Sequence, residues 1–302
     1  MEEKTGILYL VPTPIGNMED MTYRAVRTLA EVDYIAAEDT RHSGILLSHF
    51  DIHTPMISYH EHNKAEKGTQ LLTMLQEGKS IAVISDAGMP AISDPGADIA
   101  RRALEVGIRV VPLPGANAGL TALIASGQDT TGFCFIGFLP KKGRHRLEVL
   151  TRVGAYEETL IFYEAPHRLR EVLSDMKRVL GNRPVAIARE LTKRFEEFTY
   201  TNLASVVADE ESLTLKGEFV IIIGGVKTRL DEDNAEGYTN INDLSYEEEV
   251  GELMAKGIAK KEAIREVAKR RGVSRREVYN AVERANQTDG EVVRSQAEEE
   301  QE

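Results

Sequence analysis

The chain has 302 residues, of which 42% are hydrophobic, and a formal net charge of −12 at pH 7. This length is enough for two domains with cores of their own and an appended unit. No apolar stretch approaches the roughly 20 residues that a membrane-spanning helix requires. Cys134 is the only cysteine, so no disulfide can form within the chain, and we expect this thiol to be buried. The acidic N-terminus does not resemble a signal peptide, and we therefore expect a cytosolic protein.

Strand-like apolar runs alternate with helical patterns in the first part of the chain. The patterns predict strands over 7–11, 34–37, 80–84 and 108–112, and helices over 22–32, 64–76 and 97–106. Asp20 is the predicted cap of the first helix. This alternation favours a mostly parallel sheet with helices on both faces. The segment 112–115 interrupts the pattern, so we place a first α/β domain at 1–115.

The next part of the chain brings its strands closer together. We predict helices over 118–125 and 167–180, a helix after the basic segment 141–146, and strands over 133–138, 159–163, 184–190, 195–200 and 218–223. Neighbouring strands without a helix between them indicate a mixed, partly antiparallel sheet. The second α/β domain is therefore placed at 116–226.

The last part of the chain is predicted to be helical. Residues 227–243 are acidic and aperiodic and indicate a linker, and 287–302 form an acidic tail that we expect to be disordered. Between them, 244–286 fit three short helices over 246–256, 260–271 and 275–284, with Gly257 and Gly272 at the stops and Ser274 as a cap. The spacing is that of a helix-turn-helix, whose third helix would contact nucleic acid. A small packing or dimerising bundle is the alternative.

The loop Ser85–Gly96 carries the clearest functional signal. It follows a predicted buried strand and precedes a helix, which is where open α/β sheets place their ligands. Gly88 permits close backbone approach, and Pro90 and Pro95 stiffen the loop. Asp86 and Asp94 have no basic neighbour within it. A phosphate site would need amides and a lysine instead, so the loop indicates a polar, cationic ligand.

Two basic segments stand out in an acidic chain, at 139–194 and at 259–276. Clustered cations are what a phosphate backbone requires. Solvated helix faces would give the same composition, and charge alone does not decide between the two. The residues that we expect to contact RNA are Lys141, Lys142, Arg144, Arg146, Arg168, Lys269, Arg270, Arg271, Arg275 and Arg276.

Seven motifs occur in order along the chain: LVPTPIGN at 10–17, AEDTR at 37–41, the loop 85–96, PLPGANA at 112–118, FLP at 138–140, FYEAPHR at 162–168 and ARELTK at 188–193. This set resembles the tetrapyrrole-methylase-fold methyltransferases, which use S-adenosylmethionine. Within that superfamily it is similar to the bacterial enzymes that methylate the ribose 2′-oxygen of a decoding-centre cytidine in 16S rRNA. The resemblance covers residues 6 to about 225, and the added helical unit also fits the rRNA branch.

The resemblance implies two α/β domains with the methyl donor S-adenosylmethionine between them, a homodimer, no metal, and 16S rRNA of the small (30S) ribosomal subunit as substrate. Carried over by position, the donor site comprises Ser85, Asp86, Gly88, Met89, Pro90, Ala116, Asn117, Ala118, Phe162, Leu191, Gly217, Glu218 and Phe219. A sulfonium and an ammonium are cations, so Asp86 is a suitable neighbour. The segment 12–16 departs from the glycine-rich first loop of tetrapyrrole enzymes, which weakens the case for a corrin or porphyrin substrate.

Methyl transfer depends mostly on aligning the acceptor oxygen behind the methyl carbon. A ribose hydroxyl also needs help to lose its proton. The candidates are Asp39 and Glu190 as bases, and Arg41 and Lys193 to hold phosphate or favour the alkoxide. Asp39 has a second interpretation as the partner of Arg41 or as a helix cap, and Lys193 has one as a solvent-facing side chain.

Two rival functions remain at this point. One is a tetrapyrrole or other small-molecule methyltransferase of the same fold, which would need neither the basic segments nor the helical unit. The other is a nucleic-acid-binding regulator that senses a ligand through an inactive α/β domain, which would predict loss of the loop carboxylates and Arg41. The histidines indicate no metal centre: His60 and His62 alternate, and hydrogen bonding explains them more simply than metal ligation.

Overall fold

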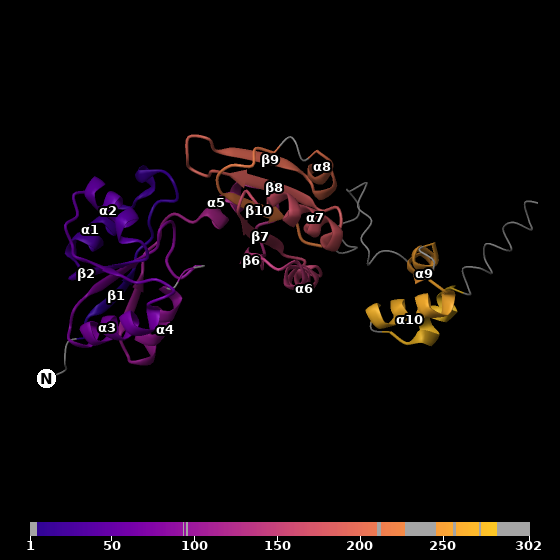
Figure 1. Cartoon of the computed structure of the whole chain (residues 1–302), viewed down its shortest axis with the longest axis horizontal. Coiled ribbons are helices and arrows are strands. Elements are labelled where there is room, and N and C mark those ends of the chain that lie inside the picture. The colour runs from indigo at the N-terminus through magenta and orange to yellow at the C-terminus, as the bar shows by residue number, and fades with distance from the viewer. Residues whose placement is uncertain are drawn as a thin grey trace, which may run out of the picture. The chain divides into compact units, whose positions relative to one another are not determined.

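The computed structural model describes residues 5–226, apart from 93, 95 and 210–212, and residues 246–282, apart from 256, 257 and 272. The chain divides into two compact units, Met1–Asp233 and Asn234–Glu302. The first unit contains two five-stranded sheets, and the second contains helices (Figure 1). The predicted linker 227–243, the tail 287–302, Gly257 and Gly272 lie outside the described residues.

The first sheet is entirely parallel, as predicted. It contains β1 (Ile7–Leu10), β2 (Tyr34–Ala37), β3 (Met56–Ser58), β4 (Ile81–Ile84) and β5 (Arg109–Pro112) in the order β3-β2-β4-β1-β5. In the register of its centre, Leu8 lies opposite both Ile81 and Val110. All four residues of β4 are buried, which is expected of a strand covered on both faces.

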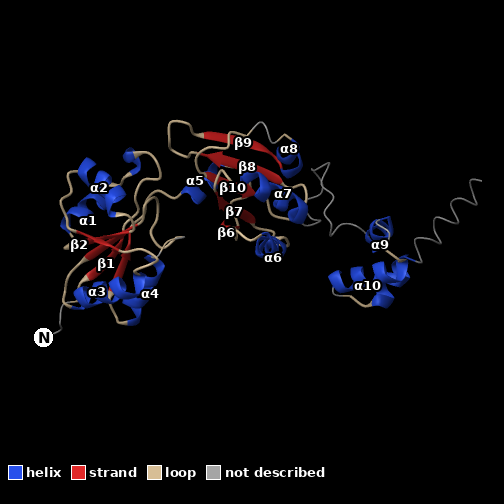
Figure 2. Ribbon diagram, viewed as in Figure 1, coloured by secondary structure: helices blue, strands red, loops and turns tan. Residues whose placement is uncertain are grey.

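Helices cover both faces of this sheet (Figure 2). On one face lie α1 (Tyr23–Glu31) and α2 (Thr40–His49), with Leu29 and Leu47 in one core cluster. On the other lie α3 (Lys64–Gln76) and α4 (Gly96–Glu105), with Leu71 and Ile99 in a second cluster. Alternation along the strands supplies both clusters, because Ile35 faces the first and its neighbour Ala36 faces the second.

The start of α1 differs from the prediction. Asp20 does not cap it, because Asp20 ends a short 3₁₀ helix, η1 (Met18–Asp20). Thr22 is the cap, and its hydroxyl oxygen accepts a hydrogen bond from the amide of Ala25 at 3.1 Å. Threonine is a good N-cap because its side chain satisfies an otherwise free amide of the first turn.

The second sheet is mixed, which confirms the prediction. It contains β6 (Phe133–Phe138), β7 (Thr159–Glu164), β8 (Pro184–Arg189), β9 (Glu197–Asn202) and β10 (Phe219–Ile223) in the order β6-β7-β10-β8-β9. Only the β6–β7 pair is parallel. One face packs on α6 (Gly143–Val153), α7 (Leu169–Leu180) and α8 (Leu203–Ala208). Of these three helices, α8 was not predicted from the sequence pattern. The opposite face packs on α5 (Ala118–Ala125).

The helical unit forms a small core of its own. It contains α9 (Tyr246–Ala255), α10 (Lys260–Arg271) and a further helix over 275–282. Val250, Val267 and Val278 belong to one buried cluster. Ser274 caps the third helix as predicted, since its hydroxyl oxygen accepts a hydrogen bond from the amide of Glu277 at 3.2 Å. No helix among the described residues is both long and apolar enough to cross a membrane.

Two residues predicted to contact RNA are instead part of the second domain's framework. Arg146 is only 1% exposed, and its guanidinium binds the carboxylates of Glu171 and of Asp175, the latter at 2.6 Å. Arg168 is mostly buried and donates hydrogen bonds to the carbonyls of Leu139 and Pro140. Arg146 links α6 to α7, and Arg168 links the segment after β6 to the start of α7, so neither presents its charge to solvent.

The buried arginine gives a stability prediction. Arg146→Ala should lower the free energy of unfolding by about 3 kcal/mol, because it removes a buried guanidinium that binds both Glu171 and the mostly buried Asp175. Arg144→Ala is the matched control on the same helix, since Arg144 is 89% exposed and pairs only with Glu148; it should change stability by less than about 0.5 kcal/mol. Urea denaturation measures both. Equal, small effects would contradict a structural role for Arg146.

Candidate active site

The site lies where the chain connections of the first sheet diverge. The chain leaves β1 toward β2 by way of α1, and it leaves the neighbouring strand β4 toward β5 by way of α4 on the opposite face. Loops that part in this way leave a crevice at the carboxyl ends of the strands. Here the two loops are joined by a backbone bridge, in which the amides and carbonyls of Thr13 and Gly88 exchange hydrogen bonds of 2.9 and 3.0 Å.

Side chains reinforce this bridge. The hydroxyl of Thr13 donates to the carbonyl of Ser85 at 3.2 Å, and the hydroxyl of Ser85 reaches the carbonyls of Ala87 and Gly88 at 3.3 Å. Gly88 has a φ of +80°, and a β-carbon there would lie 3.3 Å from the side chain of Ile15. The loop after β4 is therefore held close to the loop after β1, and glycine is required at the point of contact.

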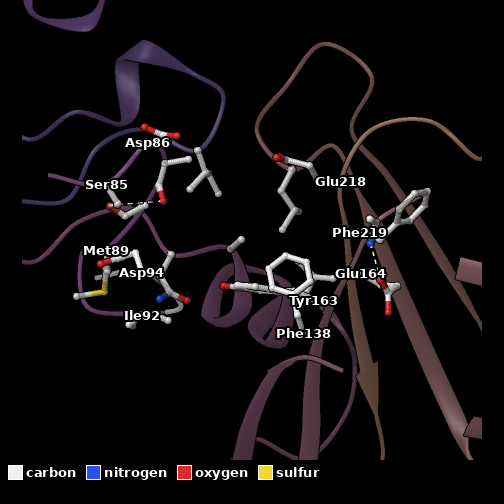
Figure 3. A pocket seen from close by; sticks show the side chains of 18 of the residues that line it. Ser85, Asp86, Met89, Ile92, Asp94, Phe138, Tyr163, Glu164, Glu218 and Phe219 are labelled. Atoms are coloured by element: carbon white, nitrogen blue, oxygen red, sulfur yellow. Dashed lines mark hydrogen bonds between the residues drawn. The ribbon is translucent and has the colours of Figure 1, made fainter. Parts of the chain in front are cut away.

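A cavity of about 360 Å³ opens beside the bridge, between the two sheets of the first unit. In Figure 3, Asp86, Met89 and Ile92 lie on one side of it, and Glu218, Phe219 and Tyr163 lie on the other. Asn117 and Ala118, at the start of α5, complete its lining. The size is that of a site for a small molecule or cofactor.

The cavity is strongly acidic. Its lining includes the carboxylates of Glu38, Asp86, Asp94, Glu164 and Glu218, and the described lining residues include no lysine, arginine or histidine. Burial raises the pKa of Glu38, and the nearby carboxylates of Asp86 and Asp94 raise it further. Such mutual repulsion is relieved by a cation, so the cavity is suited to a positively charged ligand.

Glu164 is the most buried of these carboxylates, at 2% exposed. One of its oxygens accepts a hydrogen bond from the amide of Ala165 at 2.8 Å. The other accepts none within the described residues and lies 3.5 Å from the guanidinium of Arg168. Burial raises the pKa of Glu164, with the Ala165 amide and Arg168 opposing that rise. This second oxygen is closed off from solvent, and the neighbouring Arg168 guanidinium balances its charge.

Most residues predicted to bind the donor are brought together in this cavity. Its lining includes Ser85, Asp86, Gly88, Met89, Asn117, Ala118, Leu191, Glu218 and Phe219. Pro90, Ala116 and Gly217 are not among the lining residues, although each adjoins one in the chain. The prediction that the side chain of Phe162 lines the donor site is wrong, because this side chain is fully buried in the core cluster beneath α6 and α7. Successive strand residues point to opposite faces, so the neighbouring Tyr163 faces the cavity instead.

Eleven lining residues were not among those predicted to bind the donor, although three of them lie in the loop 85–96: Ile15, Glu38, Ala87, Ile92, Asp94, Phe138, Tyr163, Glu164, Ala165, Pro166 and Val220. Tyr163 is held by its hydroxyl, which accepts a hydrogen bond from the Gly119 amide at 3.0 Å, and its ring packs edge-on against Phe138. Asp94 had already been singled out with Asp86 as a loop carboxylate, and Glu38 could have been found from sequence, because it follows the buried strand β2 at the same sheet edge as Asp86. Phe138 and Tyr163 could not, since nothing in the pattern says which face of the second sheet meets the first domain.

Asp39 and Arg41 form a local pair. Asp39 caps α2, accepting from the amides of Arg41 and His42, and its carboxylate binds the guanidinium of Arg41 at 3.1 Å. The hydrogen bond from the Arg41 side chain lowers the pKa of Asp39 to about 2. A carboxylate with this pKa is a poor proton acceptor at neutral pH. In the structure, Asp39 is therefore a helix cap and the ion-pair partner of Arg41.

Glu190 and Lys193 form a second, tighter group with Glu218. The ammonium of Lys193 donates to the carboxylates of Glu190 and Glu218, each at 2.9 Å, and Glu190 also accepts from the Glu218 amide. The hydrogen bond from Lys193 lowers the pKa of Glu190. Burial alone would lower the pKa of Lys193, but the bonds to Glu218 and Glu190 outweigh it and raise that pKa. Lys193 thus remains a cation beside the cavity.

The remaining polar clusters do not form a metal centre. No group of three or more histidine, cysteine, aspartate or glutamate side chains in the described part of the chain could hold a metal ion. His60 lies 3.2 Å from the side-chain amide of Asn63, within the turn before α3. Cys134 is partly buried and packs against the core of the second domain.

The fold and this acidic cavity define a class of methyltransferase. The family model for Tetrapyrrole (Corrin/Porphyrin) Methylases matches residues 7–207, and the chain belongs to this family. Its relatives include proteins named Ribosomal RNA small subunit methyltransferase I. The one from Halalkalibacterium halodurans is 51% identical, over 91% of this chain and 94% of the relative. The one from Bacillus subtilis is 48% identical over the same shares. These matches confirm the resemblance drawn from the seven motifs.

Solved structures show the same fold at much lower identity. Uroporphyrin-III-C-methyltransferase from Thermus thermophilus is 19% identical, with a TM-score of 0.53, over 72% of this chain and 94% of that chain. A complex of that enzyme with S-adenyl homocysteine has a TM-score of 0.51 at 20% identity, over 72% of this chain and 97% of that chain. The methyltransferase CobJ is 21% identical with a TM-score of 0.56, over 74% and 96%. At these identities the likeness concerns the fold alone.

The Asp39 pair gives a pH prediction. Because the pKa of Asp39 falls from 3.8 to about 2 on folding, its ionised form stabilises the folded state. That stability is fully present above about pH 4 and is lost as the pH falls toward 2. Asp39→Asn should therefore lower the urea midpoint by a constant amount between pH 5 and 7, and the difference from the unmodified protein should shrink below pH 4. A difference that grows on acidification would contradict the pairing.

Proposed function

We propose that the chain transfers a methyl group from S-adenosylmethionine to a ribose 2′-hydroxyl of 16S rRNA, at a decoding-centre cytidine of the small (30S) ribosomal subunit. The observation that carries the proposal is the acidic cavity at the divergence of β1 and β4, in a chain about half identical to proteins named for methylation of small-subunit rRNA. The nucleotide and the 2′-oxygen are the finer part of the proposal and come from the motif resemblance.

The cavity residues fit the methyl donor. S-adenosylmethionine carries a sulfonium and an ammonium, and it supplies an electrophilic methyl group when bound. The carboxylates of Asp86, Glu218 and Glu38 would hold these cations. Met89, Ile92 and Phe219 supply apolar walls.

Neither Asp39 nor Glu190 is suited to act as the base, so alignment and charge are the main contributions to the reaction. Asp39 and Glu190 both have lowered pKa values and are already engaged by cations. Lys193 stays protonated, so it can lower the energy of a developing alkoxide but cannot accept its proton. Arg41, 90% exposed at the edge of the site, is placed to meet phosphate.

Two exposed basic surfaces support an RNA substrate. On the second domain, Lys141, Lys142 and Arg144 are exposed before and at the start of α6. On the helical unit, exposed Lys269, Arg275 and Arg276 lie near Tyr279, which is half exposed. The side chains of Arg270 and Arg271 lie outside the described residues. Filter binding across a salt series would test both surfaces, since a phosphate contact makes affinity fall with salt.

A homodimer is the second partner that we propose, and an apolar face of the second sheet supports it. Among the described helices of the second domain, α5 packs on this face, and Phe133 on β6, Ile124 on α5 and Tyr200 on β9 remain exposed there. Exposed apolar residues gathered on one face mark a protein interface. Sedimentation velocity would test this, and a monomer at micromolar concentration would count against it.

We also propose a cytoplasmic location, where its ribosomal substrate is found.

The function is tested by methyl transfer from labelled S-adenosylmethionine to small ribosomal subunits from a strain that lacks this protein, followed by mass mapping of the nucleosides. The expected result is one 2′-O-methylcytidine in the decoding centre. Label on a base or on a different nucleotide would overturn the finer part of the proposal. No transfer by a protein that still binds the donor would overturn the rRNA substrate.

The acidic lining gives a prediction for donor binding. Asp86→Asn keeps the oxygen that accepts from the Asp39 amide at 3.2 Å but removes the charge. It should weaken S-adenosylmethionine binding about tenfold, or ~1.4 kcal/mol, by calorimetry. Glu66→Gln, an exposed carboxylate on α3 outside the cavity, is the control and should leave binding unchanged. Equal affinities for both variants would show that Asp86 does not contact the donor's charge.

A further inference from the structure

A second cavity, of about 250 Å³, adjoins the acidic one. It lies between the loop after β1, the first half of α2 and the side chain of Lys193. The two cavities share five lining residues, which form a common wall: Ile15, Ser85, Asp86, Ala87 and Glu218. Ligands in the two cavities would therefore lie next to each other and contact the same residues.

The charge changes across this wall. The first cavity has carboxylates and no cationic side chain among its described lining residues, whereas the second is also lined by Lys193 and His42. The two carboxylate partners keep Lys193 protonated despite its burial, and two of the three hydrogens on its nitrogen are used by Glu190 and Glu218. The third remains to be shared with an oxygen of a ligand. The first cavity is therefore suited to a cationic donor. The second cavity, which presents the ammonium of Lys193, is suited to an oxygen-rich, anionic acceptor.

Part of the second cavity is apolar. Pro14, Leu46, Met18 and Ile45 line it, and Ile45 is 66% exposed although it lies in the middle of α2. An exposed isoleucine at the mouth of a cavity offers a flat apolar contact for a planar ring. Enzymes that modify one nucleotide in folded nucleic acid commonly take it out of its stack into a cavity of this kind.

We propose that the second cavity receives the single target nucleotide, flipped out of the rRNA, with its base against Ile45 and Met18 and its ribose toward the shared wall. This inference rests on the proposed function. In the transfer, the 2′-oxygen bonds to the methyl carbon, the carbon–sulfur bond breaks with its electron pair going to sulfur, and the hydroxyl proton passes to water. Lys193 is a positioning residue that donates a hydrogen bond to the ribose or its phosphate.

The first test fills the cavity. Ile45→Trp should lower kcat/KM for small ribosomal subunits at least about tenfold, while the Kd for S-adenosylmethionine changes less than about twofold. Ile92→Trp, which crowds the first cavity, should do the reverse and weaken donor binding. Leu104→Trp, an exposed position on α4 outside both cavities, is the neutral control. If Ile45→Trp behaves like Leu104→Trp while the unmodified protein methylates rRNA, this inference is wrong and the proposed function stands.

A second measurement locates the nucleotide directly. A photoreactive benzoylphenylalanine placed at position 45 should crosslink, with S-adenosyl homocysteine present, to the nucleotide that the unmodified enzyme methylates. Primer extension identifies the crosslinked nucleotide, and circular dichroism confirms that the variant is folded. Crosslinks to other nucleotides, or none from a folded variant that binds small subunits, would overturn the proposal. Failure of the unmodified enzyme to methylate any small subunit would instead overturn the proposed function.

Discussion

The bridge between Thr13 and Gly88 is the constraint on which both cavities depend. It joins the loops of two neighbouring strands whose helices lie on opposite faces of the sheet, so these loops would otherwise part. Because the bridge holds them together, Ile15 and the 85–87 segment form a thin wall with a cavity on each side. The backbone approach requires glycine at position 88, and the Thr13 hydroxyl ties the same wall to Ser85.

The second domain completes this arrangement from across the cavity. Its contribution comes from strand ends and the loop after β8, where Glu190 and Thr192 both adopt positive φ values. Such left-handed residues are costly and persist where surrounding contacts hold them. Here the holding contact is the Lys193 ammonium between Glu190 and Glu218, with the lysine chain lying over Gly16 of the first domain. One cation therefore organises the loop and faces the second cavity.

Much of the fold was predictable because both cores follow simple periodicities. The fully apolar β4 could only be a central strand, and the closely spaced strands after 184 could only pair antiparallel. The helices that cover the faces of the sheets were harder to predict. For example, α8 is six residues long and has no cap signal beyond Asn202. Arg146 shows a different kind of error, in which a buried side chain was predicted to contact RNA. It was assigned to RNA by its basic neighbours, although it shares a helix face with Leu150 and Val153 at helical spacing, which identifies a buried position.

The site was predictable on the side of the first domain only. Loops at the carboxyl edge of a parallel sheet must converge, which places Asp86 and its neighbours together from sequence alone. The face that a mixed sheet turns toward a partner domain depends instead on where α5 docks, and β7 is buried on both faces, so Phe162 and Tyr163 look alike in the sequence. The docking of α5, with the Gly119 amide on the Tyr163 hydroxyl, chooses between them. This contact within the second domain thus selects which aromatic residue faces the acidic cavity.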